Sequence, residues 1–260
     1  MTVTIEGHVA DVCLNRGDKL NALDKAMFDA LIGCGRELAA DRSVRAVVLH
    51  GDGRSFCAGL DFASFMASPK ALDEMLARDT DSIANFAQRA AWVWREVPVP
   101  VIAALHGHVY GGGLQLAAAA DIRYATPDAK LSIMEIKWGL VPDMSGTQTL
   151  RHLVRHDVLK ELTFTGRVVE GREAQTLGLV THVTEDPLAA ARATAAEIAT
   201  KSPHAIRADK RLLDNAVVGT IEDGLRLEEE LQRTLLGSKN QLEAVASGMA
   251  KRPGKFVDPE

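Results

Sequence analysis

The stretch HVYGGGLQL, at residues 108–116, decides how this chain of 260 residues is expected to fold. It follows the apolar run VIAAL at 101–105, which is typical of a buried strand, and it precedes AAAA at 117–120, which favours a helix. Glycines at the point where a strand passes into a helix leave bare backbone N–H groups at the helix N-terminus. Such groups attract negative charge, either on a phosphate or on an oxyanion that develops during a reaction.

A second segment of similar design lies earlier in the chain. The run VVLH at 47–50 predicts a strand, and SFCAGLDF follows at 55–62. Gly59 relaxes the steric restriction of the backbone, so the N–H of Leu60 can face a ligand. Either glycine cluster alone can be only a tight turn. Together, the two strand-to-turn junctions offer two amides that can hold one oxygen.

Composition and charge exclude several classes of protein. Hydrophobic residues at 47% and charged residues at 25% are ordinary for a soluble globular protein. A net charge of −5 and the absence of a long basic run argue against a nucleic-acid partner. The few cysteines lack metal-ligand spacing and suit a reducing compartment. Without a signal-peptide pattern or an apolar stretch near the roughly 18 residues of a membrane span, we expect a cytoplasmic protein with no membrane partner.

Predicted strands alternate with predicted helices, which indicates a parallel sheet with helical crossovers. The strands are expected at 9–14, 45–50, 101–105 and 122–124, and the helices at 24–40, capped by Asp24, and at 84–96. From about Pro187 onward the pattern is helical, notably at 189–200 and 225–236. This tail must bury its apolar faces against the core or against another subunit.

Taken in order, these motifs resemble the crotonase family, also called the enoyl-CoA hydratase/isomerase family. The matching segments extend over nearly the whole chain: LNR at 14–16, LNAL at 20–23, FCAGLD at 56–61, GGG at 111–113, ADIRYA at 120–125, EIKWGLVPD at 135–143, GTQ at 146–148, TGR at 165–167 and GLV at 178–180. The resemblance implies an α/β fold with a crotonase-type ββα spiral core and a C-terminal helical trimerisation region. We expect residues 1–195 to form the core with the CoA and active sites, and residues 196–260 to form the oligomerisation region of a homotrimer or hexamer.

The resemblance also implies the chemistry of the site. Members of the family bind acyl-CoA thioesters and stabilise an enolate-like oxyanion, and the matching donors here are the backbone N–H groups of Leu60 and Gly112. Coenzyme A is then part of the substrate, and no separate cofactor or metal is expected. His106 and His108 form an H-x-H pair, but no third residue has a spacing that would complete a metal site.

The CoA site carries over from the same resemblance. The backbone around Ala58, Asp61 and Phe62 matches the place where the family holds the adenine end of CoA. Lys19 or Arg16 can meet the CoA phosphates, or both can be ordinary solvated charges. The segment 62–79 is expected to line the acyl pocket with apolar side chains, namely Phe65, Met66, Leu72, Met75 and Leu76.

The catalytic acids decide the reaction. Hydratases of this family use two carboxylates, and at the first of these positions the chain has Gln115, whose amide can hold a water but cannot take its proton. The second position is Glu135, which lies among apolar neighbours rather than in a polar surface run. Asp143 matches an acid of the family's dienoyl-CoA isomerases, although the segment after it also looks like a helix start, for which Asp143 would be the cap.

One acid in place, with a second nearby, favours a double-bond shift over the addition of water. We therefore expect a double-bond isomerase with Glu135 as acid and base. The first alternative is an enoyl-CoA hydratase that works with Glu135 and Gln115. The second is a non-catalytic acyl-CoA-binding homologue, for which Gln115 would mark lost chemistry.

Overall fold

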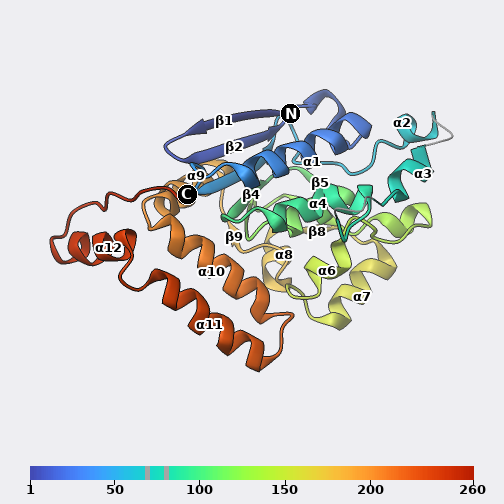
Figure 1. Cartoon of the computed structure of the whole chain (residues 1–260). Coiled ribbons are helices and arrows are strands. Elements are labelled where there is room, and N and C mark those ends of the chain that lie inside the picture. The colour runs from blue at the N-terminus through green and yellow to red at the C-terminus, as the bar shows by residue number, and fades with distance from the viewer. Residues whose placement is uncertain (68–70, 79–81) are drawn as a thin grey trace.

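The main sheet of the protein has six strands, in a computed structural model that describes residues 1–67, 71–78 and 82–260 (Figure 1). The strand order is β1-β2-β3-β4-β6-β9, and every neighbouring pair is parallel except the antiparallel β1 and β2. The strands are β1 (Thr2–Glu6), β2 (Val9–Leu14), β3 (Ala46–Gly51), β4 (Val101–Leu105), β6 (Ile122–Ala125) and β9 (His182–Val183). The predicted parallel sheet is confirmed.

A second, three-stranded sheet makes the fold a spiral. It contains β5 (His108–Tyr110), β7 (Lys130–Ser132) and β8 (Val169–Glu170) in the order β5-β7-β8. Two successive turns of the chain each add a strand to the main sheet and then one to this sheet, and the first of them adds β4 and β5 before the helix α5 (Gly112–Ala118). The next turn adds β6 and β7 before the short helix η2 (Glu135–Trp138). These are the ββα turns that the sequence resemblance implies.

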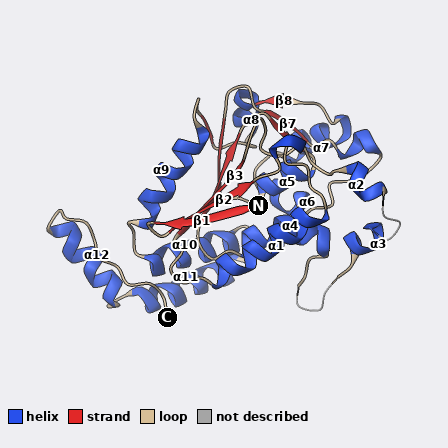
Figure 2. Ribbon diagram, turned by 90° about the horizontal axis from the view of Figure 1, so that it is seen from above, coloured by secondary structure: helices blue, strands red, loops and turns tan. Residues whose placement is uncertain are grey.

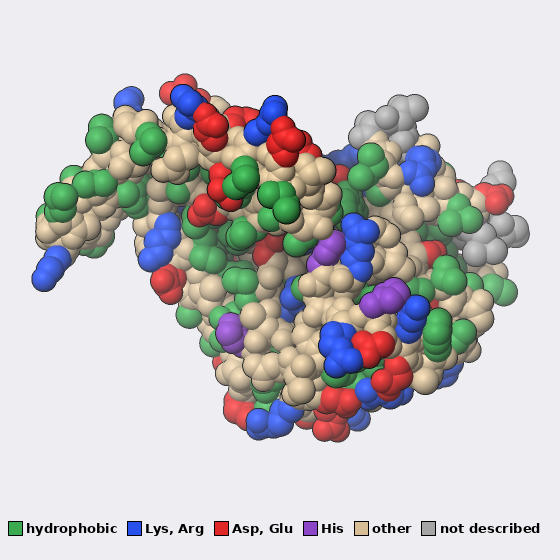
Figure 3. Space-filling model, turned by 90° about the horizontal axis from the view of Figure 1, so that it is seen from below, with side chains coloured by type: hydrophobic (Ala, Val, Ile, Leu, Met, Phe, Trp, Pro, Cys, Tyr) green, Lys and Arg blue, Asp and Glu red, His purple; other side chains and the backbone are tan. Residues whose placement is uncertain are grey.

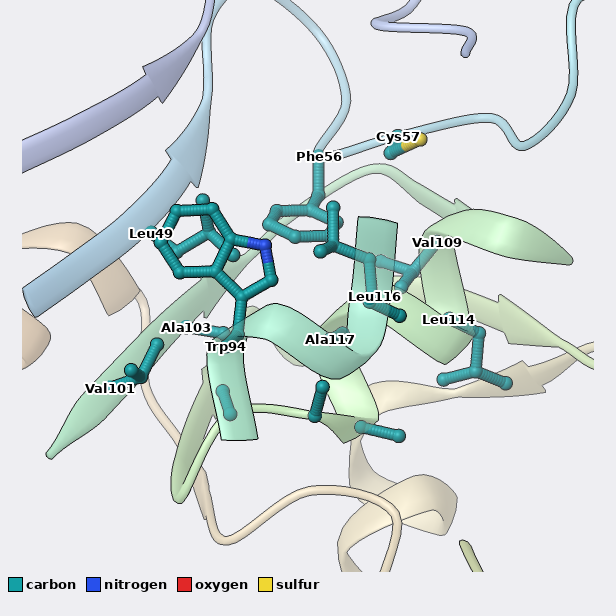
Figure 4. Close-up of a cluster of buried hydrophobic side chains, with 14 of the residues drawn as sticks. Leu49, Phe56, Cys57, Trp94, Val101, Ala103, Val109, Leu114, Leu116 and Ala117 are labelled. Carbon is teal, nitrogen blue, oxygen red and sulfur yellow. The ribbon is translucent and has the colours of Figure 1, made fainter. Parts of the chain in front are cut away.

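Helices cover both faces of the main sheet (Figure 2). One face packs against α1 (Lys25–Ala40), α4 (Phe86–Glu96) and α5, and the other against α9 (Pro187–Ala199). For this reason every residue of β3 and β4 is buried, as expected for parallel strands enclosed on both sides. Figure 4 shows the indole of Trp94 beside Leu49 and Phe56 in the larger core.

Local signals set the helix boundaries. The carboxylate of Asp24 accepts from the backbone N–H of Met27 and so caps α1, as predicted. The helix expected at 84–96 begins at Phe86, because Asn85 and Gln88 form a capping box there. The remaining elements of the core are η1 (Gly17–Lys19), α2 (Phe62–Met66), α3 (Ala71–Leu76), α6 (Gly146–Leu150), α7 (His156–Thr165) and α8 (Gly171–Leu177).

The predicted helical tail is present, and most of it forms an arm. The arm consists of α10 (Pro203–Ala216), α11 (Ile221–Leu235) and α12 (Lys239–Met249), and α12 lies at the end of the molecule opposite α2 and α3 (Figures 1 and 2). The boundary expected between 195 and 196 falls inside α9, which packs on the sheet, so the arm begins with α10, which is joined to the core through the buried Lys210. Figure 3 shows hydrophobic side chains at the surface of this arm. The large hydrophobic residues exposed on its helices include Leu213, Ile221, Leu225, Leu242 and Met249.

No helix in the described ranges combines the length and apolar character needed to cross a bilayer.

Candidate active site

The two glycine junctions lie side by side. The N–H of Tyr110 donates to the carbonyl of Cys57 at 3.0 Å, and Cys57 and Val109 form a parallel bridge. Gly59 and Gly111 have φ angles of +90° and +51°, which glycine adopts without strain. A Cβ atom added to Gly59 would lie 3.8 Å from the backbone nitrogen of Gly112. The fold therefore brings together the two segments that the sequence analysis singled out.

Two backbone N–H groups are free at this junction. Among the described residues, the N–H groups of Leu60 and Gly112 donate to no protein acceptor. The neighbours of Leu60 are fixed instead, because the carbonyl of Gly59 accepts from Leu23 and the N–H of Asp61 donates to Leu23. Gly112 is the first residue of α5, where an N–H has no partner within the helix. Both donors are thus left unused by hydrogen bonds within the described protein.

Glu135 is a buried carboxylate at the start of η2, with 8% of its surface exposed. Its Oε1 atom accepts from the side-chain amide of Gln115 at 2.6 Å, whereas its Oε2 atom is buried without a partner in the described chain. Burial raises the pKa of Glu135, and the nearby charge of Asp143 raises it further. A partly desolvated carboxyl with one unoccupied oxygen suits proton transfer.

Gln115 is almost fully buried, with 1% exposed, and its oxygen is already occupied. The Oε1 atom accepts from the backbone N–H groups of Met144 at 2.8 Å and Gly146 at 2.9 Å. A carbonyl oxygen has two lone pairs, so none is left to orient a water. The oxygen of Gln115 is therefore used within the protein, so any contact of this amide with a water would have to come from its NH₂ group.

Asp143 does not cap the helix that follows it. The N-cap of α6 is Ser145, and no N–H of α6 donates to the carboxylate of Asp143 in the described structure. The helix-cap interpretation is therefore wrong. Partial burial raises the pKa of Asp143, and the charge of Asp143 contributes in turn to the raised pKa of Glu135.

The candidate CoA residues differ in what they are free to do. Arg16 is engaged within the protein, because it pairs with Asp61 at 2.8 Å and donates to the carbonyl of Ala22 at 2.9 Å. Asp61 in turn accepts from Ser64 and caps α2. These bonds hold the segment after Leu60 in place. Arg16 therefore stabilises this segment through an ion pair inside the protein. Lys19, by contrast, is exposed.

Ala58 lies beside the segment that carries Arg16 and Lys19, because the N–H of Ala58 donates to the carbonyl of Leu20 at 3.0 Å.

The expected acyl-pocket segment is only partly described, since residues 68–70 and 79 and the side chain of Leu72 lie outside the described part. Phe65 is buried and packs edge-on against Phe28, and Met75 is half-buried against the core. Met66 and Leu76 are exposed. Phe65 and Met75 therefore pack into the hydrophobic core. Of the described side chains expected to line the acyl pocket, Met66 and Leu76 are the exposed ones.

Sequence reasoning missed an aromatic contact at the site. The ring centroids of Phe62 and Trp138 lie 4.5 Å apart. Trp138 is the last residue of η2 and is half exposed. The hydrophobic type of both positions was visible in the sequence, but their contact depends on the tertiary fold.

The two described cavities lie elsewhere. They have volumes of about 490 and 710 Å³ and are lined mainly by residues of α4, α10 and α11, with many charged side chains. None of the candidate site residues lines either of them. The candidate site is instead defined by the glycine junctions, Glu135 and the loop around Asp143.

Two sheets wound into one spiral, followed by a helical arm, define a protein of the crotonase fold. The family model of the enoyl-CoA hydratase/isomerase family matches residues 4–259, and the chain belongs to this family. It is therefore an enzyme of the enoyl-CoA hydratase/isomerase class, in a family that acts on acyl-CoA substrates.

Relatives of both activities are similar to the chain. The mitochondrial Delta(3,5)-Delta(2,4)-dienoyl-CoA isomerase of Mus musculus is 34% identical over 264 residues, covering 96% of this chain and 79% of that protein. The mitochondrial enoyl-CoA hydratase domain-containing protein 2 of Homo sapiens is 33% identical over 259 residues, covering 96% and 85%. The crystal structure of enoyl-CoA hydratase from Bacillus anthracis superposes with a TM-score of 0.90 at 27% identity, covering 98% of this chain and 99% of that one.

Proposed function

We propose that this enzyme shifts a carbon–carbon double bond in an enoyl-CoA thioester, with Glu135 carrying the proton. The observation that supports this most is the pairing of a buried Glu135, whose Oε2 atom is unoccupied, with an amide at position 115. A hydratase of this family has a second carboxylate where Gln115 stands. The chain therefore lacks the acid that would activate a water.

The proposed step needs only groups of this chain and the substrate. The Oε2 atom of Glu135 removes a proton from the carbon next to the thioester carbonyl, and the electron pair moves onto the carbonyl oxygen. The N–H groups of Leu60 and Gly112 stabilise that oxyanion, and each such donor contributes roughly 3–4 kcal/mol in known enzymes. The same carboxyl then returns the proton to a carbon farther along the chain, and the double bond moves.

Asp143 extends the proposal to conjugated substrates. In a dienoyl-CoA the proton travels farther along the acyl chain, so a second carboxyl beside Glu135 can accept or return it. The raised pKa of both carboxyls supports such a relay, because each holds a proton to a higher pH than an exposed acid does. Similarity to a dienoyl-CoA isomerase agrees with this assignment.

The alternative is an enoyl-CoA hydratase in which Glu135 acts with Gln115 in place. Similarity to solved enoyl-CoA hydratases keeps this alternative open. Purified enzyme given a 3-enoyl-CoA and, separately, a 2-enoyl-CoA distinguishes the two. We expect isomerisation of the first to be faster than hydration of the second, and the reverse order would contradict the proposal.

We also propose a homotrimer or hexamer, built through the arm. The apolar side chains exposed on α10, α11 and α12 support it, because a soluble protein rarely leaves such a surface uncovered. Mass measurement in solution tests the assembly. For CoA itself, we propose that Lys19 meets a phosphate and that Ala58, Asp61 and Phe62 border the adenine end.

A further inference from the structure

The loop before α6 presents two amides to one oxygen. Ser145 has a φ angle of +64°, in the left-handed region that a residue other than glycine seldom adopts. This conformation turns the N–H groups of Met144 and Gly146 toward the Oε1 atom of Gln115, at 2.8 and 2.9 Å. Neighbouring amides that converge in this way form a concave site for negative charge.

These two bonds determine which way the amide of Gln115 points. Since its oxygen faces the loop, its NH₂ group must face Glu135, and it donates to Oε1 there at 2.6 Å. The opposite orientation would set an oxygen against the carboxylate and an NH₂ against two N–H donors. The side chain of Gln115 is also packed tightly against the loop, because a Cβ atom on Gly146 would lie 2.6 Å from the oxygen of Gln115.

We propose that Gln115 is a positioning residue: its neutral amide keeps Glu135 ionised with Oε2 aimed at the substrate, and it ties Glu135 to the loop that bears Asp143. The inference rests on the proposed function and deepens it. Gln115 does not touch the reacting atoms. It acts by occupying Oε1, which leaves the other oxygen as the base, and by fixing the distance between the two acids.

The charged groups around Glu135 make this inference testable by pH. Asp143 is the carboxyl whose charge acts on it, while Lys137 of η2 lies over the ring of Trp138. Helices α5 and α6 carry no charged residue. The titratable side chains of α7, which packs against η2, are His156, Asp157, Lys160 and Glu161, and of these Asp157 and Glu161 are paired with arginines.

A carboxylate at position 115 would fit the two loop amides but would oppose Glu135. The variant Gln115→Glu keeps the shape and the acceptor oxygen, and it brings a second negative charge next to Oε1. Two carboxyls so close share one proton, so Glu135 stays protonated to higher pH. The variant Gln115→Met keeps the size and removes all three hydrogen bonds.

The test follows deuterium exchange at the α-carbon of a short saturated acyl-CoA in heavy water, as a function of pH. This readout requires the base but neither isomerisation nor hydration. For Gln115→Glu we expect the acid limb of the exchange rate to move up by about one pH unit or more, with recovery toward the wild-type rate above it. For Gln115→Met we expect a lower rate at every pH, because the carboxyl and the loop are no longer held.

The exposed Gln232 in α11 provides the matched control, and Gln232→Glu should leave the profile unchanged. An unmoved acid limb in Gln115→Glu, with a uniform loss of rate or with none, would overturn the inference while the proposed function stands. A wild-type enzyme that exchanges no α-proton would overturn the proposed function and this inference together.

Discussion

The ring of Phe62 packs on the ring of Trp138, with centroids 4.5 Å apart and planes tilted by 37°. Phe62 follows the segment that carries the free N–H of Leu60, and Trp138 ends the short helix that Glu135 begins. The contact therefore joins the proposed oxyanion donor to the proposed base. It also sets an apolar surface at the edge of the site, because half of Trp138 is exposed.

Replacing Trp138 by alanine removes the exposed apolar surface of the indole and its contact with Phe62. Because an aromatic pair contributes about 0.5–1.5 kcal/mol beyond its buried area, kcat/KM should fall about two- to tenfold. Steady-state kinetics with acyl-CoA esters of increasing chain length measure the effect. Trp92→Ala, in α4 away from the site, is the control, and an equal loss in both variants would count against a role for the aromatic pair.

Replacing Glu135 by glutamine removes the base. The rate should fall by about 10²–10⁴, the usual contribution of a general base. In the wild type kcat/KM should decline as the pH falls through a pKa above the ordinary value of 4.5, because burial favours the protonated carboxyl. A pH profile of the wild type, together with the rate of the variant, measures both effects.

The same pKa shift affects stability. A carboxyl whose pKa is raised in the folded state destabilises the fold when it ionises, so stability is lost as the pH rises from about 4.5 through the folded-state pKa. Glu135→Gln has no such group. Thermal unfolding across this range should therefore show the wild type losing stability relative to the variant as the pH rises, and parallel curves would contradict the burial effect.

Lys19 and Arg16 should give different results, although the sequence offered both for the CoA phosphates. Lys19→Ala should raise the KM for acyl-CoA, and more so at low salt, because an exposed charge attracts phosphate by screened electrostatics. Arg16→Ala should lower the melting temperature, because it releases Asp61 from a 2.8 Å ion pair. Kinetics at two salt concentrations and a melting curve of each variant make the comparison. Matching effects in both variants would contradict it.

Gly113 tests the geometry of the glycine junction. A Cβ atom there would lie 2.4 Å from the carbonyl oxygen of Cys57, so Gly113→Ala must push α5 away from the neighbouring segment and move the N–H of Gly112. We expect loss of activity and a lower melting temperature. Gly33→Ala, in the middle of α1 with nothing within 4 Å, should keep full activity and gain about 0.5–1 kcal/mol.

Much of the fold followed from local pattern. Asp24 before an apolar-periodic run predicted the cap of α1, and the apolar run at 101–105 predicted β4. Where tertiary contacts decide, the sequence was insufficient. Asp143 matched the pattern of a cap, but the chain turns at Ser145 instead.

In the candidate site, too, features set by residue type were predictable from the sequence, and those set by tertiary contacts were not. Glycine spacing and the identity of Glu135 were readable, because they depend on residue type and position. The three hydrogen bonds of Gln115 were not, because they join α5 to η2 and to a loop with a left-handed residue. No pattern along the chain indicates that such a loop turns two amides toward one side chain.

The central claim is that one carboxyl, that of Glu135, carries the proton between two carbons of the substrate. The most direct measurement supplies a 3-enoyl-CoA labelled with deuterium at its second carbon and locates the label in the 2-enoyl product. Because Glu135 is only 8% exposed, we predict that part of the deuterium appears at the fourth carbon. A product with only solvent hydrogen at that carbon, formed equally well by the Glu135→Gln variant, would contradict the account.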